Sequence, residues 1–100
     1  MKTDFHAILS DAFSKPVAAE RGIGCGRIYV AITDDAAAKE IAKAAKRLGK
    51  IFDKRSHYGT RNALYIGYDN CDGMALARGT AIVSALKAAG VSCYRDEHGD

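Results

Sequence analysis

Eight basic side chains lie close together in the middle of this chain, and the chemistry they offer is the binding of anions. Only Glu40 and Asp53 oppose them, so this block carries +6 and the other residues −3, which gives the net charge of +3. A one-sided concentration of positive charge raises the local concentration of anionic ligands. The eight residues of the block are Lys39, Lys43, Lys46, Arg47, Lys50, Lys54, Arg55 and Arg61.

Four of these lysines have spacings of 4, 3 and 4, which puts Lys39, Lys43, Lys46 and Lys50 on one stripe of a helix. The stripe lacks the glutamates at i,i+4 that usually accompany exposed lysines, and this favours an anionic partner. The alternative stays open. Lysines are common on the solvated face of an amphipathic helix, and charges on an edge strand prevent aggregation between sheets.

Few residues have types that could support catalysis or metal binding. Cys25 with His57 could form a nucleophile and its base, and Cys71, Cys93 and His98 could bind a metal if the fold gathered them. No CxxC motif occurs, and the glycine-rich segment 22–26 precedes a strand instead of following one, unlike a phosphate-binding loop.

The scattered carboxylates Asp69, Asp72, Asp96 and Asp100 are better suited to cap helices and solvate the C-terminal tail than to bind a metal. We therefore predict no enzyme activity, no metal site and no cofactor.

The three cysteines are odd in number and widely spaced, which indicates small buried thiols in a reducing compartment. No signal-peptide pattern occurs in residues 1–10, and no apolar run approaches the roughly 20 residues that span a bilayer. We therefore predict a cytoplasmic protein that does not associate with membranes.

Apolar periodicity divides the 100 residues into alternating helices and strands of one predicted domain, 1–100. A helical extension, 1–22, precedes a βαββαβ core, 27–95. Thr33 is the expected N-cap of the second helix, and Gly49 its stop. The expected helices are 4–14, 34–48 and 74–89, and the expected strands are 27–32, 50–57, 61–68 and 91–95, followed by a polar tail.

Two right-handed β-α-β crossovers that share one sheet predict an α+β, ferredoxin-like two-layer sandwich, preceded by the N-terminal helix. The alternation of side chains places Tyr29 and Tyr65 on the sheet face away from the two core helices. Whether that face is open, or is covered by the N-terminal helix with its Phe5, Ile8 and Phe13, stays undecided at this point.

The segments RIYVAI and RNALYIGY resemble the first-strand and third-strand signatures of the RNA-recognition motif family. Tyr29 matches the base-stacking position of the first signature, while Arg61 and Tyr65 match a basic and an aromatic position of the third. Asn62, Ala63 and Leu64 depart from the glycine, aromatic and small residues of that pattern. The resemblance implies stacking of unpaired bases on Tyr29 and Tyr65, with basic side chains on the phosphates.

Two functions follow as hypotheses. The first is a non-enzymatic module that binds RNA or single-stranded DNA through the basic residues. The second is an inhibitor that docks on a protein or nucleoprotein complex, since compact proteins of this length resemble, as a class, phage-encoded anti-CRISPR proteins, several of which have ferredoxin-like folds. The alanine-rich and glycine-rich last helix, or an open sheet face, would also allow a homodimer in either case.

Overall fold

A computed structural model describes residues 2–21 and 24–99 of the chain. Within this part the protein is an α+β structure with three helices and one four-stranded antiparallel sheet, which confirms the predicted class. The elements in chain order are α1 (Phe5–Ser14), β1 (Cys25–Ile32), α2 (Asp35–Arg47), β2 (Phe52–Arg55), β3 (Arg61–Asn70), α3 (Met74–Ala88) and β4 (Cys93–Gly99). Gly22 and Ile23, from the glycine-rich segment noted above, lie outside the described residues.

The strands lie in the order β2-β3-β1-β4, and every neighbouring pair is antiparallel. The two central strands pair from Cys25 opposite Asn70 to Ala31 opposite Ala63, with a register shift between Ile28 and Tyr29. Such a shift locally increases strand twist and re-aims the side chains that follow it.

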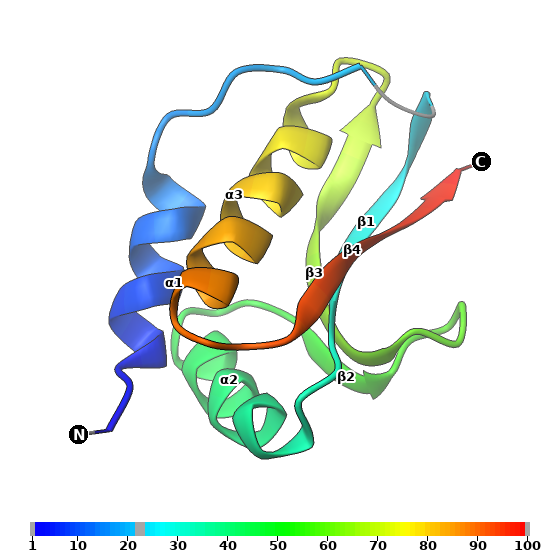
Figure 1. The fold of residues 1–100 in the computed structure, drawn as a ribbon. Helices are drawn as coiled ribbons and strands as arrows, with labels where there is room; N and C mark the ends of the chain where they lie inside the picture. The colour runs from blue at the N-terminus through cyan, green and yellow to red at the C-terminus, as the bar shows by residue number, and fades with distance from the viewer. Residues whose placement is uncertain (1, 22–23, 100) are drawn as a thin grey trace.

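The helices lie on one face of this sheet (Figure 1). Side chains two residues apart lie on the same face of a strand, so Val30 and Ile32 of β1 join Ile41 of α2 and Ile82 of α3 in one buried core. Burying each of these side chains stabilises the fold by about 1.5–3 kcal/mol.

Helix α1 packs against α2 and α3, on the side of the helical layer remote from the sheet (Figure 1). Its Leu9 and Ala12 are fully buried and join the same core. The alternative in which this helix covers Tyr29 and Tyr65 is therefore wrong. The physical reason is that the apolar side of α1 is buried against α2 and α3, where Leu9 and Ala12 share a core with Ile41 and Ile82.

Local signals set the limits of α2. Asp34, and not Thr33 as predicted, is the N-cap, and its carboxylate accepts the N–H of Ala37 at 3.1 Å. Lys46 and Arg47 lie in the last turn, where the helix dipole favours cations. Gly49 then has φ of 71°, which a residue with a side chain rarely adopts, so the predicted stop is confirmed.

The polar end of the chain was predicted to be a solvated tail, and this prediction is wrong. Residues 96–99 continue β4, where Asp96 pairs with Tyr29 and Glu97 with Ile28. Ladder hydrogen bonds to a central strand outweigh the low strand propensity of these polar residues.

Candidate functional site

All eight side chains of the basic block are exposed, but they do not form one continuous surface. Lys39, Lys43, Lys46 and Arg47 project from α2, Lys50 follows that helix, Lys54 and Arg55 lie on β2, and Arg61 begins β3. Their neighbours divide them into separate groups.

One group lines a groove between α2 and the edge strand β2, which we call the α2–β2 groove. Its volume is about 570 Å³. Three elements each contribute a cation to it: Lys39 from α2, Lys54 from β2 and Arg61 from β3. Within the described residues, Lys39 and Lys54 form no ion pair. The complete lining is Asp35, Ala38, Lys39, Ala42, Phe52, Lys54, Arg61 and Asn62.

One end of the α2–β2 groove also contains a carboxylate. The side chain of Arg61 donates to both oxygens of Asp35, at 3.3 and 3.4 Å, and the Asn62 amide donates to Asp35 Oδ1 at 3.0 Å. The three cations and this one carboxylate leave the groove with a net charge of +2. Because the Arg61–Asp35 pair is exposed on both sides, it contributes little to stability.

Asn62 connects this end of the groove to strand β1 through hydrogen bonds of its side chain. Its φ is 47°, in the left-handed region that glycine and asparagine tolerate best, and its amide also donates to the carbonyl of Ile32 at 3.1 Å.

The other five basic residues lie elsewhere. Lys43 pairs with Glu40 at 3.8 Å, and Lys43 and Arg47 both line a separate hollow beside the N-terminal end of α1. Lys50 lies over the ring of Phe13 at 4.5 Å. Arg55 donates to the carbonyl of Gly59, while Lys46 lines neither hollow. The predicted lysine stripe is therefore a boundary between two hollows.

The two tyrosines of the predicted stacking surface do lie together. Their ring centroids are 5.3 Å apart, and Tyr65 is half-buried. Tyr29, however, is only 7% exposed, because Tyr58 and His98 also contact its ring. Burial raises the pKa of the Tyr29 phenol, so it stays neutral. A base could reach the face of Tyr29 only if the loop that carries Tyr58 moved away.

That loop, residues 56–60, is held by a polar cluster that the sequence did not reveal. Thr60 donates to the Asp96 carboxylate, and the Nε2 atom of His98 lies 3.0 Å from the same Asp96 oxygen and 3.1 Å from Thr60 Oγ1. Tyr58 stacks on the His98 ring at 4.6 Å and accepts a hydrogen bond from Arg27.

These residue types suggest a catalytic triad, but their geometry does not support one. A triad base holds its carboxylate through one ring nitrogen and its nucleophile through the other. Here both contacts of His98 use Nε2, and the Thr60 hydroxyl donates its hydrogen bond directly to Asp96. The cluster fastens the loop to β4.

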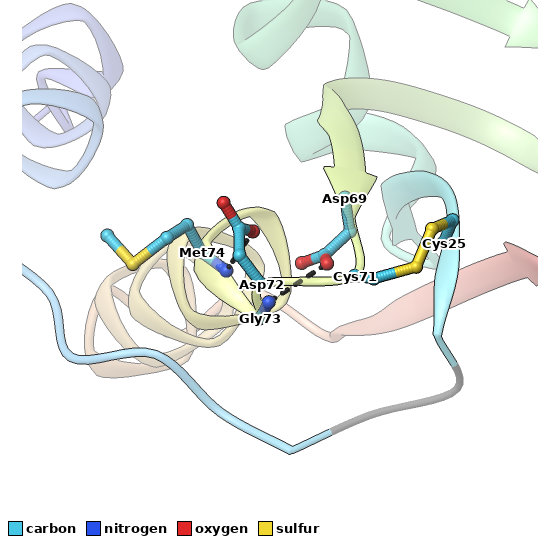
Figure 2. Close-up of a disulfide and its surroundings, with 6 residues drawn as sticks. All are labelled: Cys25, Asp69, Cys71, Asp72, Gly73 and Met74. Carbon is cyan, nitrogen blue, oxygen red and sulfur yellow. Dashed lines mark hydrogen bonds between the residues drawn. A yellow bond between two sulfur atoms is a disulfide. The ribbon is translucent and has the colours of Figure 1, made fainter.

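The prediction of three reduced, buried thiols is wrong for two of them. Cys25 and Cys71 form a disulfide that joins the start of β1 to the residue after β3 (Figure 2). Only Cys93 is free and buried. Cys25 is therefore no nucleophile for His57. Disulfides are rare in the reducing cytosol, so the cytoplasmic prediction loses one of its supports.

Among residues 2–21 and 24–99, no three metal-ligating side chains gather, and Cys71 is bonded to Cys25 instead of lying beside Cys93 and His98. None of the described helices is both long enough and apolar enough to cross a membrane.

Comparison of the chain with models of protein families, with curated proteins and with solved structures gives no match. Any functional conclusion therefore depends on the geometry described above. In that geometry, the α2–β2 groove is where residues of the basic block from three elements come together.

Proposed function

We propose that this protein is a small binding module that holds the phosphates of a single-stranded nucleic acid in the α2–β2 groove. The observation that carries the proposal is the convergence of Lys39, Lys54 and Arg61 on one groove from three different elements. A cleft lined by one sign of charge focuses the field and attracts anions, and phosphate oxygens are the usual partners of Lys and Arg.

We also propose a ferredoxin-like fold as the frame of this site. Its support is the placement of β1 and β3 at the centre of the sheet and of β2 and β4 at its edges, with α2 and α3 making the two long connections. In such a frame the hairpin strand β2 is an edge strand. Its outward side therefore stays accessible to a ligand that also contacts α2.

Charge reversal in the groove tests the proposal. We expect Lys39→Glu/Lys54→Glu to weaken binding of a labelled single-stranded oligonucleotide at least about tenfold, because two phosphate contacts become repulsive. For the unchanged protein, fluorescence anisotropy over a salt series should give a log–log slope of about −2, which is −0.7 for each of three contacts.

The matched control is Lys43→Glu/Lys46→Glu, which changes the net charge by the same amount at two positions of α2 outside the groove. It should weaken binding much less. Equal losses in both variants would show that the groove has no special role. If the unchanged protein binds neither RNA nor single-stranded DNA at low salt, the proposal is wrong. The alternative hypothesis, docking on a protein or nucleoprotein complex, would then be favoured.

The Asp35 carboxylate predicts a change in the opposite direction. Since Asp35 competes with phosphate for Arg61, we expect Asp35→Asn to raise the affinity about two- to threefold, the size of an exposed ion pair. The control is Asp34→Asn, which removes the same charge while asparagine keeps the N-cap. Titration of both variants with the same oligonucleotide measures the difference, and an equal gain in the two would contradict a specific role for Asp35.

A further inference from the structure

The α2–β2 groove is not lined by charge alone. Between its cations lie Ala38 and Ala42 from α2 and the aromatic ring of Phe52 from β2. Phe52 packs against the core but stays half-buried, so its outer side contributes to the groove. A surface that bound only phosphates would need no apolar floor, because phosphate groups stay hydrated and gain nothing from contact with hydrocarbon.

We propose that one unpaired nucleobase enters the α2–β2 groove and lies against Phe52, Ala38 and Ala42 while the flanking phosphates contact Lys39, Lys54 and Arg61. This inference rests on the proposed function and names what part of the nucleic acid the groove takes. The occupant follows from complementarity: an apolar floor beneath a rim with net positive charge matches a flat ring attached to an anionic backbone.

The size of the groove supports this occupant. Its volume of about 570 Å³ lies within the range of sites for small organic ligands. A base in a duplex has both faces stacked and its edge paired, so it cannot enter. The groove should therefore prefer single strands to duplexes, which a purely electrostatic surface would not do.

The uncharged polar residue that lines the groove, Asn62, already uses its donors. The Asn62 amide donates its two hydrogens to the carbonyl of Ile32 and to Asp35. It therefore has no donor left for the edge of a base. The base is held by its face and not read by its edge, so we expect little discrimination among the four bases.

A pair of matched substitutions on α2 tests the proposal. Ala42→Leu fills the groove without changing its charge, whereas Ala36→Leu places the same side chain on an exposed position outside the groove. The probes are a short labelled DNA strand, an RNA of the same sequence, the same DNA with abasic sites, and its duplex.

We expect Ala42→Leu to lower the affinity for the intact DNA and RNA strands about tenfold, which is the scale of one lost base–aromatic contact. Its affinity for the abasic strand should equal that of the unchanged protein. Ala36→Leu should change neither. Phe52→Leu, which keeps an apolar side chain against the core, should also lower the affinity for intact strands, and its melting temperature would show that it still folds.

Two results would overturn the inference. One is an Ala42→Leu variant that binds intact strands as tightly as the unchanged protein does. The other is an abasic strand or duplex that the unchanged protein binds as tightly as the intact strand. In either case, a salt slope of about −2 and a loss of binding in Lys39→Glu/Lys54→Glu would still support the phosphate-binding function, so the two proposals fail separately.

Discussion

Replacing Cys25 and Cys71 with serine is expected to lower the free energy of unfolding by about 4 kcal/mol. The disulfide closes a loop with a sequence separation of 46 residues, and the chain-entropy relation gives about this value for such a loop. In the native structure, the bonded residues are already adjacent because Cys25 pairs with Asn70, the neighbour of Cys71. The bond therefore acts mainly by restricting the unfolded chain.

Denaturant titration of the unchanged protein and of Cys25→Ser/Cys71→Ser, each with and without a thiol reductant, measures this effect. Reductant should destabilise the unchanged protein by a similar amount and have no effect on the variant, which serves as the control. Alkylation of the denatured, unreduced protein should label one cysteine, Cys93. Labelling of three would contradict the disulfide.

The disulfide lies at the opposite end of β1 from the α2–β2 groove, since Cys25 begins that strand and Asn62 contacts the carbonyl of Ile32, which ends it. Reduction should therefore leave the affinity of the folded protein for an oligonucleotide unchanged.

The helices and strands could be predicted from the sequence because their signals are local. The spacing of Ile28, Val30 and Ile32 predicts a strand at this position, and the structure confirms it. Helix limits come equally from nearby residues, such as Gly49 after α2. These patterns are enough for the α+β class and for the pairing of two tyrosines on one sheet face.

The features that the sequence did not reveal depend on register between distant segments. Thr60, Asp96 and His98 meet only because β4 pairs with β1 as far as Gly99. Residues 95–98 are all polar, so no apolar alternation indicated a strand there. Gly26 lies opposite this segment, where a Cβ atom would collide with the backbone carbonyl of His98.

The candidate site was predicted in part. The basic block pointed to a binding surface, but residue spacing on one helix joined Lys39 to Lys43 and Lys46, whereas the fold joins Lys39 to Lys54 and Arg61. The hairpin brings β2 and the start of β3 alongside α2, and only the packing of a strand against a helix decides which lysines share a groove. The odd number of cysteines likewise could not show that two of the three form a disulfide.

Helix α3 begins with an arrangement that predicts the second large effect. Its N-cap, Gly73, has φ of 76° and no side chain to bind the first N–H groups. Asp69, which is 1% exposed, takes that role from the end of β3: its two oxygens accept the N–H groups of Gly73 and Leu76, each at 3.0 Å (Figure 2 shows the first of these bonds). The sequence predicted a cap here, and the structure confirms it.

We expect Asp69→Ala to lower the free energy of unfolding by about 3 kcal/mol, because buried N–H donors lose charge-assisted partners and no water can replace them. The matched control is Asp72→Ala. Asp72 is exposed, and among residues 2–21 and 24–99 its side chain accepts only the N–H of Met74, at 3.1 Å, so its loss should cost about 1 kcal/mol or less. Urea unfolding measures both values, and equal costs would show that burial of the Asp69 bonds contributes nothing.

The same carboxylate predicts how stability changes with pH. Burial alone would raise the pKa of Asp69, but the N–H groups of Leu76, Gly73, Ala75 and Asp72 outweigh it and leave the pKa below the ordinary value of 3.8. A group whose pKa falls on folding binds a proton more readily when unfolded, so its contribution is complete above the unfolded pKa and is lost as the pH falls through the folded one.

Stability should therefore decline below about pH 4 in the unchanged protein. Hydrogen bonds from Thr80 and Arg95 also lower the pKa of Glu20, so that residue contributes to the same decline. Asp69→Asn should be less stable at neutral pH but lose less stability between neutral and acidic pH, since its side chain does not titrate. Urea titrations of both proteins across this range test the expectation, and parallel pH profiles would show that the pKa of Asp69 does not change on folding.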